Sequence, residues 1–572
     1  MSAMGAIGHS PLGAAELVLI NGKIRTPEHP SGFVRAMAIG GGMVRALGSE
    51  DDVRAYTGPY TRVIDLRGRL AIPAFGDAHV HPVLGGLDGQ RCNLLGRRTA
   101  QECLVQIAGH SGRLPRDAWV VGGGWSNSAF PGGVPSAAEL EKVSGGRPAF
   151  LLNRNHHSAW VNTTALRLAG VTGSTPDPAD GRIERDSSGQ PTGVLHDGAV
   201  RLVSAYVPAP TAAELAEALL SAQRFLHSVG ITSVQDACVG EADEMGIPDT
   251  FGTYLRAATD HRLSMRVTGA LWWDRSLGLS QVDRLLARRA AADGSGYFRA
   301  TAVKIMLDGV CESFSAAMGS PYLDGHGRET SHSGRLFIEP AELTEVARSL
   351  SDHGFQLHFH AVGDRAVTAA LDAIEDLPRP ARNTARHHIA HAQFIRPADL
   401  DRFARSGAVA TFQPLWACDN EQNYLLAVPY TGPERAAWQY RIGEVFRRAG
   451  RVAFGSDWPV SSPNPLQQIH VAVNRMLSPR LGRPGSPETS RPLRPAEAIP
   501  VDAAVYAFTA GVAYVNHEDH VTGTLRPGML ADVAVLDRDI YTVPPETIGD
   551  TSVAMTIASG QVVHGDELVN AG

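Results

Sequence analysis

The central part of the chain alternates short apolar segments with longer amphipathic ones. The stretches 212–230 and 340–354 are predicted helices, and each ends in glycine, a common signal at the end of a helix. Strands that alternate with helices predict a parallel sheet. The candidate strands are GDAHVH (76–81), ITSVQDA (231–237), MRVTGAL (265–271), AVKIMLDG (302–309), FQLHFHA (355–361), RHHIAHA (386–392), AVATFQP (408–414) and RVAFGSD (451–457).

These eight strands fit a TIM barrel, the α/β fold in which eight strands and eight helices alternate around a closed sheet. A doubly wound open sheet is the alternative, but no GxGxxG sequence follows a first strand. We therefore predict a (β/α)8 barrel over residues 73–510.

Both ends of the chain show a different pattern, in which short apolar strands are separated by Gly- and Asp-rich turns. Such strands occupy 15–72 and return near the other end in GTLRPGMLADVAVLD and SVAMTIASGQVVHGDELV. The two ends can pair into one small β-sandwich, with residues 1–72 as its N-terminal part and 511–572 as its C-terminal part. Two unrelated small β pieces are the alternative.

One region interrupts the alternation of strands and helices. Between about residues 94 and 200 the chain contains WVVGGGW, RPAFLLNRNHHSAWVN and DPADGRIERDSSGQPTGVLHDGA, which indicates a long insertion after the first barrel strand. Insertions on that face of a barrel usually shape the substrate site. We expect this insertion to do the same.

Composition narrows the class of protein. The chain has 572 residues, of which 43% are hydrophobic and 19% charged, as in a globular protein with a substantial core. Its net charge of -7 argues against a nucleic-acid-binding protein. The five cysteines form no CxxC pair, which favours reduced thiols. We find no signal peptide and no membrane-spanning stretch, so we expect a cytoplasmic protein without membrane contacts.

Candidate chemistry begins at His79 and His81, near the end of the first predicted barrel strand. Residues i and i+2 of a strand point to the same side, so both imidazoles would face the barrel interior. Imidazole is a suitable ligand for Zn, Fe, Ni or Mn. Two ordinary histidines are the alternative, because an HxH sequence alone is only a moderate signal.

Histidine, lysine and aspartate recur near the ends of the other predicted strands. A barrel brings these strand ends together in one bowl. An ammonium group buried there without a partner would be costly. The clustering therefore favours a metal site. The residues concerned are Lys304, His358, His360, His387, His388, His391 and Asp457.

The ordered set of segments resembles the amidohydrolase superfamily, and within it the amidohydrolase 3 (YtcJ-like) group, which includes N-substituted formamide deformylase. The resemblance covers nearly the whole chain and implies a metal-dependent hydrolase with a TIM barrel. It rests on NGKI, GDAHVHP, HHSAWVNTTALRLAG, GQPTGVLHDGA, VKIMLDG, HAVGDRAV, RHHIAHAQ, TFQP, GSDWPVSSPNPL and GTLRPGMLADVAVLD.

The resemblance implies ligands for one or two divalent metal ions, with zinc as the expected metal. His79 and His81 match the first-strand ligands of the more buried metal. Lys304 matches a lysine that is often carboxylated and then bridges two metals; a plain lysine paired with an acid such as Asp308 is the alternative. The remaining ligands would be His360, His391 and Asp457.

Position along the strand separates these ligands from their neighbours. His360 and His391 each stand at the end of a strand, whereas His358 would pack lower in the barrel or form a hydrogen bond. The two histidines that open RHHIAHAQ would support the site or be ordinary buried histidines. The family usually reads RHRIEHAQ, but here Ala390 replaces the Glu. Ala390 and His391 would point to opposite sides, so the ligand role of His391 is unaffected.

The expected chemistry is hydrolysis by metal-activated water. A divalent metal lowers the pKa of bound water to about 7. Asp457 would take a proton from this water and pass it to the leaving nitrogen. The metal, together with a histidine, would stabilise the oxyanion, and His391 is the second catalytic candidate. As an alternative, Asp457 in Ser-Asp-Trp-Pro would begin a helix or lie in a turn.

Aromatic residues near strand ends and in the insertion predict a largely apolar substrate site. For each tryptophan, packing in the core is the alternative. The pattern favours a hydrophobic or aromatic small molecule as substrate. The candidate substrate-binding residues are Trp125, His157, Trp160, Trp272, Trp416 and Trp458.

We therefore expect cleavage of a C–N bond in an amide, formamide or cyclic amide with an apolar group. A deaminase or imine hydrolase on the same barrel is the first alternative, because one fold supports several reactions. A catalytically inactive scaffold is the second, but such a protein would be expected to have lost the ligands that this chain retains. From the resemblance we also expect a homodimer.

Overall fold

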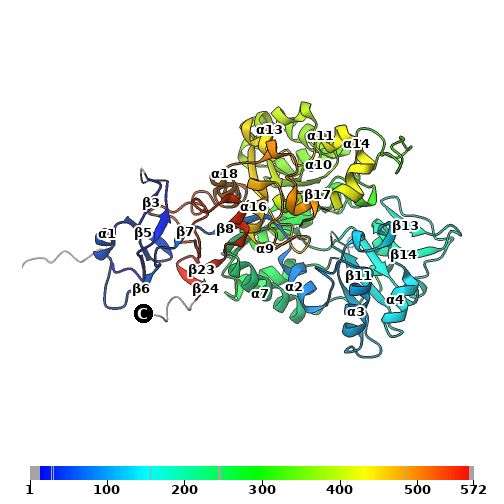
Figure 1. The fold of residues 1–572 in the computed structure, drawn as a ribbon, viewed down its shortest axis with the longest axis horizontal. Helices are drawn as coiled ribbons and strands as arrows, with labels where there is room; N and C mark the ends of the chain where they lie inside the picture. The colour runs from blue at the N-terminus through cyan, green and yellow to red at the C-terminus, as the bar shows by residue number, and fades with distance from the viewer. Residues whose placement is uncertain are drawn as a thin grey trace, which may run out of the picture.

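Eight parallel strands form the central sheet in the order in which they occur along the chain (Figure 1). The computed structural model describes residues 13–565 except 28, 30, 155, 243–246, 421, 483 and 484. Each predicted barrel strand is present, which confirms the predicted fold. The strands are β8 (Phe75–Val80), β15 (Ile231–Val239), β16 (Arg266–Trp272), β17 (Phe298–Met306), β18 (Gln356–Ala361), β19 (His388–His391), β20 (Val409–Phe412) and β21 (Arg451–Phe454).

Backbone hydrogen bonds just past the last strand join it to the first and close the barrel. The Asp457 N–H donates to the carbonyl oxygen of His79 at 2.7 Å, and the His81 N–H donates to that of Trp458 at 2.9 Å. Gly455 makes this approach possible, because a Cβ at that position would lie 2.6 Å from the His79 nitrogen. Closure therefore brings Asp457 beside the His79–His81 segment.

Helices follow the strands and cover the outside of the barrel (Figure 1). The two predicted helices are α7 (Ala212–Ser228) and α10 (Pro340–Asp352). Within the described ranges, no helix is both long and apolar enough to cross a membrane. The other covering helices include α8 (Phe251–Thr259), α9 (Val282–Ala292), α11 (Asp364–Glu375), α13 (Leu400–Ser406), α15 (Ile442–Arg447) and α16 (Pro465–Asn474).

Both ends of the chain contribute to a β-sandwich, drawn in blue and red beside the barrel in Figure 1. Its sheets enclose a core that includes Leu19, Met37, Val533 and Ile557. The sandwich built from both termini is thereby confirmed. One sheet has β5 (Met43–Gly48), β4 (Ala36–Gly40), β1 (Leu17–Ile20) and β6 (Arg62–Asp65); the other has β24 (Gln561–His564), β23 (Val553–Ala558), β22 (Val533–Leu536), β7 (Leu70–Pro73), β2 (Lys23–Arg25) and β3 (Phe33–Val34).

A further six-stranded sheet lies between β8 and β15 in the chain, drawn in cyan in Figure 1. It packs near α2 (Pro82–Gln90), the helix that follows β8. The residue limits that we gave for the three parts of the chain and for the insertion stay predictions. In spatial order the strands are β13 (Gly181–Arg185), β14 (Pro191–Asp197), β12 (Ser158–Val161), β11 (Ala149–Asn153), β10 (Val120–Trp125) and β9 (Cys92–Asn93).

Candidate metal centre

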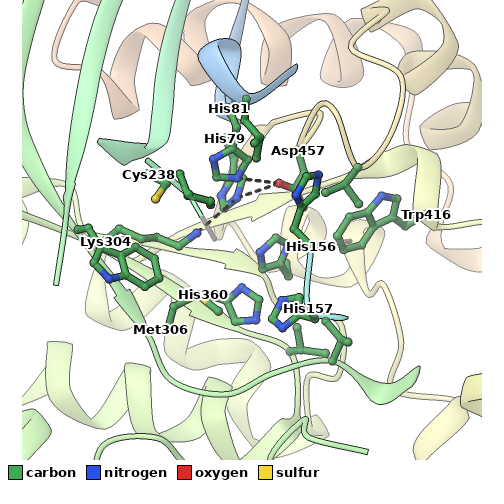
Figure 2. Close-up of a pocket in the computed structure, with 17 residues that line it drawn as sticks. His79, His81, His156, His157, Cys238, Lys304, Met306, His360, Trp416 and Asp457 are labelled. Carbon is green, nitrogen blue, oxygen red and sulfur yellow. Dashed lines mark hydrogen bonds and ion pairs between the residues drawn. The ribbon is translucent and has the colours of Figure 1, made fainter. Parts of the chain in front are cut away.

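A cavity opens at the carboxyl-terminal ends of the barrel strands, where barrel enzymes place their active sites (Figure 2). It contains about 520 Å³ of space, including its mouth. All six predicted metal ligands line this one cavity, although they come from four strands, from the residue directly after β8 and from the turn after β21. They are His79, His81, Lys304, His360, His391 and Asp457.

Three of these side chains converge most closely. The ligand atoms of His79, His81 and Asp457 all lie within 4.8 Å of one another. Asp457 Oδ1 lies 3.3 Å from His79 Nε2 and 3.1 Å from His81 Nε2. Asp457 has a φ of 56°, in the left-handed region that non-glycine residues rarely adopt. Such strained backbone is often found at functional sites.

The ring of His79 is oriented by a hydrogen bond on its far side. His79 Nδ1 lies 2.8 Å from His358 Nε2, so the other nitrogen, Nε2, faces the cavity. His358 belongs to β18 and is fully buried. It therefore supports His79 and does not line the cavity.

His360 and His391 line the cavity beside this group. Their ring centroids are 4.4 Å apart, and the His391 ring lies 4.7 Å from that of His79. His391 Nδ1 lies 2.9 Å from Gln413 Oε1, which leaves its Nε2 for the cavity. His388 at the start of β19 and His387 just before it do not line the cavity: His388 Nε2 bonds to Gln235 Oε1 at 2.7 Å, and His387 Nδ1 accepts from the Leu357 N–H.

Lys304 projects from β17 into the same group. Its Nζ lies 3.4 Å from His79 Nε2. Asp308, the acid considered as its partner, accepts instead from the backbone N–H groups of Ala317, Val362 and Gly363. Burial lowers the pKa of Lys304 to about 8, although Asp457 and other acidic groups nearby oppose this shift.

Burial sets the charge of the remaining groups. It lowers the pKa of His79 and His360 well below the usual value and that of His391 to about 3, so these imidazoles are neutral at pH 7. Burial disfavours the charged form of Asp457, but its hydrogen bond with His81 and the nearby Lys304 outweigh this effect. The pKa of Asp457 therefore lies below its usual value, and the carboxylate is ionised.

Three of the six predicted substrate-binding residues line the cavity. His157 Nδ1 lies 2.8 Å from Asp197 Oδ1, and its ring lies 5.4 Å from that of His360. Trp416 stacks on His391, with centroids 5.3 Å apart and planes 1° from parallel. Trp272 contributes to the apolar side of the cavity.

The other three tryptophans do not line this cavity. Trp125 and Trp160 are fully buried in the inserted sheet and donate to the carbonyl oxygens of Leu151 and Ser136. Trp458 packs against Phe225, with ring centroids 5.3 Å apart. We therefore assign these three side chains to the core, since they are buried against other side chains and not against the cavity.

Two groups at the end of β15 were not predicted. Asp236 Oδ1 lies 3.8 Å from His81 Nδ1, and its other oxygen accepts from the Tyr254 hydroxyl at 2.6 Å. Burial raises the pKa of Asp236 to about 6. Cys238 lines the cavity directly. A signal for both existed, because the segment ITSVQDAC places them at the end of a predicted barrel strand.

The donor set fits a divalent metal ion. His79 and His391 each use Nδ1 for a protein partner, which leaves Nε2 of a neutral imidazole available as a ligand. Asp457 adds an anionic oxygen within the same 4.8 Å group as His79 and His81. Imidazole and carboxylate are donors that zinc accepts, and an engaged Nδ1 is usual for a metal-binding histidine.

A parallel barrel with imidazole, lysine and carboxylate groups gathered at its carboxyl-terminal mouth defines a metal-dependent hydrolase. The model of the Amidohydrolase family matches residues 62–564. The chain belongs to this family, which confirms the resemblance predicted from the sequence and the assignment as an enzyme.

Similar proteins cover almost the whole chain. Protein LONG AFTER FAR-RED 3 of Arabidopsis thaliana is 30% identical over 96% of this chain and 92% of its own length. N-substituted formamide deformylase of Arthrobacter pascens is 27% identical over 95% of this chain and 97% of its own. A solved structure, an uncharacterized metal-dependent hydrolase from Pyrococcus furiosus, is 26% identical with a TM-score of 0.69, covering 92% of this chain and 100% of that one.

Proposed function

We propose that this protein hydrolyses a C–N bond in a small amide, formamide or cyclic amide that carries an apolar group. The observation that carries the proposal is the convergence of His79, His81 and Asp457 within 4.8 Å at the mouth of the barrel. One or two divalent metal ions, with zinc expected, would be held there. The ligands would be His79, His81, Lys304, His360, His391 and Asp457.

A divalent metal in this position would supply an activated water and polarise the substrate carbonyl. The residues supply positioning and proton transfer. Asp457 is a carboxylate at neutral pH, because its pKa lies below the usual value. It would take the proton of the attacking water and pass it to the leaving nitrogen. His391, neutral and fixed by Gln413 and Trp416, donates its Nδ1–H to Gln413, so its unprotonated Nε2 would help to hold the metal beside the developing oxyanion.

Lys304 would act as a modified ligand. Its lowered pKa of about 8 leaves more neutral amine at pH 7 to 8 than an ordinary lysine has. A neutral amine can add to the carbon of CO2 and lose a proton, which converts the side chain into an anionic carbamate. The carbamate would lie beside His79, since Lys304 Nζ is 3.4 Å from His79 Nε2.

The apolar part of the substrate would lie against one side of the cavity. Leu84, Ile247, Trp272 and Met306 belong to a single apolar cluster and also line the cavity. Such a surface favours an aliphatic or aromatic group near the scissile bond. The relative named N-substituted formamide deformylase supports formamides as one class to test.

The reaction is tested by supplying zinc-loaded enzyme with N-formyl amines, acyl amides, lactams and amino-heterocycles. We expect formate or another acid to be released together with an amine. Release of ammonia from amino-heterocycles, with no acid from any amide, would replace this proposal with a deaminase.

The role of Asp457 is tested by Asp457→Asn. We expect turnover to fall about a hundredfold or more, the usual size of a general acid–base contribution. Asp372→Asn, at an exposed carboxylate on α11, is the matched control and should keep full turnover. Metal content is measured in all samples. An Asp457→Asn enzyme with bound metal and near-wild-type turnover would contradict the assignment.

A cytoplasmic location is also part of the proposal. It is supported by the five cysteines, which are all free and buried. Such thiols fit a reducing compartment. The predicted homodimer stays a prediction, which sedimentation of the purified protein would test.

A further inference from the structure

A second cavity lies beside the metal cavity. It contains about 540 Å³ of space, and Val310, Trp416 and Val460 line both cavities. In Figure 2, Trp416 stands across the metal cavity from Lys304 and Met306. A substrate bound at the metal centre would therefore reach the second cavity by extending past Trp416.

The two cavities differ in chemistry. The first has the apolar cluster of Leu84, Ile247 and Trp272 on one side. The second is walled mainly by polar side chains. A molecule that fills both would have an apolar end and a polar end. The polar residues of the second cavity are Arg154, Glu312, Gln393, Asn420, Asn423 and Tyr440.

Asn423 gives the strongest indication of a ligand. The residue is only 4% exposed, and neither its amide nitrogen nor its amide oxygen has a hydrogen-bond partner in the part of the chain that the structure describes. A buried amide with both groups unpaired is unfavourable and rare. Asn423 also lies in the π-helical turn η9 (Gln422–Ala427), a type of turn found frequently at functional sites. A ligand that accepts from the nitrogen and donates to the oxygen would satisfy both atoms.

The charges on the wall favour a neutral ligand group. Arg154 is held by its own Nε, which donates to the carbonyl oxygen of Val460 at 3.0 Å. Burial lowers the pKa of Arg154, with Cys418 and Glu312 opposing the shift, but a guanidinium stays charged at neutral pH. Glu312 places a carboxylate on the same wall, so the two charges offset each other. Burial raises the pKa of Tyr440 well above its usual value, which keeps its hydroxyl protonated.

We propose that the second cavity binds the polar end of the substrate, a neutral group that both donates and accepts hydrogen bonds, such as a primary carboxamide or a ureido group. Asn423 would pair with both sides of this group, and Arg154 would donate to its oxygen. The inference rests on the proposed C–N hydrolysis in one respect, which is that the scissile bond lies at the metal centre. The substrate class becomes an amide with an apolar group on one side and a neutral polar group on the other.

Two pairs of amides test this inference, because a carboxamide and an isopropyl group have nearly the same shape. The first pair is N-phenylacetyl-β-alaninamide and N-phenylacetyl-3-methylbutylamine. The second pair reverses the amide and consists of N-benzylsuccinamide and N-benzyl-4-methylpentanamide. With zinc-loaded enzyme, we expect the carboxamide member of at least one pair to have a kcat/KM about tenfold higher than its isopropyl partner.

Asn423→Leu removes both hydrogen-bonding atoms with little change in volume. We expect it to reduce the preference to about twofold or less, through a lower kcat/KM for the carboxamide compound. Leu425→Asn alters an exposed residue of the same turn, 48% exposed, and should keep the full preference. Equal kcat/KM values within both pairs for the wild type would overturn the inference, and so would a preference that survives Asn423→Leu.

Direct binding separates this inference from the proposed reaction. If zinc-loaded enzyme cleaves none of the four compounds, their affinities are measured by calorimetry. A carboxamide preference in affinity that Asn423→Leu abolishes would support the second cavity while the proposed hydrolysis fails. Equal affinities of the two members in both pairs would overturn the inference.

Discussion

At the residue scale, the direction in which His79 points depends on a column of buried polar groups beneath it. His79 Nδ1 meets His358 Nε2 at 2.8 Å, and the ring of His358 lies 3.9 Å from that of His388. His388 in turn bonds to Gln235, whose Nε2 donates to Gln356 Oε1 at 2.9 Å. The column restrains the His79 ring because each member is held by the next.

His358→Leu should therefore weaken metal binding without removing a ligand. We expect zinc affinity to fall about 10- to 100-fold, the usual effect of removing the partner of a metal-binding histidine. The measurement is a zinc titration in competition with a chelator. His353→Leu, at an exposed histidine after α10, is the control. An unchanged affinity in a folded His358→Leu protein would show that packing alone orients His79.

A second residue-scale prediction concerns acid stability. Burial, together with the nearby His517, lowers the pKa of His387 to about 3 from the usual 6.5. Between pH 6.5 and about 3, the unfolded chain therefore binds a proton at this residue, whereas the folded protein does not. The stabilisation by neutral His387 is complete above pH 6.5 and decreases as pH falls, by about 2 kcal/mol at pH 5.

The variant His387→Asn tests whether neutral His387 makes the protein less stable as the pH falls. The Asn Oδ1 can replace Nδ1 as the acceptor for the Leu357 N–H, so the variant should fold. We expect its free energy of unfolding to fall less between pH 7 and pH 5 than that of the wild type, by about 2 kcal/mol. Denaturant titrations at the two pH values measure this difference. If the free energy of unfolding fell by the same amount between pH 7 and pH 5 in both proteins, the prediction would be contradicted.

The sequence predicted which strand ends meet in the cavity, but not what each side chain contacts. Histidines two residues apart, as His358 and His360 are, share one side of a strand, and depth in the barrel decides which lines the cavity. The sequence was even less informative about Trp125 and Trp160. A tryptophan in a strand looks the same in the sequence whether its side chain faces a substrate site or the core. Their indole N–H groups donate to the backbone carbonyls of Leu151, in the inserted sheet, and of Ser136, just before α4 (Ala137–Val143).

At the scale of elements, the alternation of strands and helices was enough to predict the barrel, whereas contacts between helices were not predictable. Helix α2 begins directly after His81 and packs on α7. At Gly86 the helices approach so closely that a Cβ would lie 2.0 Å from the Ala218 carbonyl oxygen. Such a contact depends on the position of two helices far apart in sequence, and no local pattern reports it.

Gly86→Ala should separate these helices. We expect it to lower the free energy of unfolding by about 2 kcal/mol, as an added methyl group in a packed contact does. It should also lower zinc affinity, because a shift of α2 would move His81, the residue at which this helix begins. Gly89→Ala lies on the same helix with open space around it, and should raise stability by about 0.5 kcal/mol. Equal effects of the two variants on unfolding would argue against the packing explanation.

At the scale of the whole molecule, a buried ion pair links the barrel to the sandwich. Arg266 on β16 donates to Asp532, beside β22, at 2.6 Å, and Asp532 also accepts from Thr522 at 2.6 Å. Glu518 lies 3.4 Å from the same guanidinium. The sandwich was predictable from the similar strand patterns at both ends. The ion pair was not, because no local pattern shows that Arg266 and Asp532, which are 266 positions apart, come together.

Asp532→Asn should destabilise the protein by about 3 kcal/mol, because it leaves a buried guanidinium with less compensating charge. The denaturant midpoint reports this loss. Asp401→Asn removes the partner of Arg448 in an exposed pair and should leave the midpoint almost unchanged. Similar midpoints for Asp532→Asn and wild type would show that the link contributes little to stability.

The pairing of β7 with β22 joins residues about 460 positions apart, as Ile72 and Ala534 show. A ribosome that adds 5–20 residues per second needs on the order of half a minute to a minute and a half to cover that distance. Throughout this time one edge of β7 has no partner strand, and an unpaired edge is a template for aggregation. We therefore expect the nascent chain to depend on chaperones that bind its N-terminal strands until β22 leaves the ribosome.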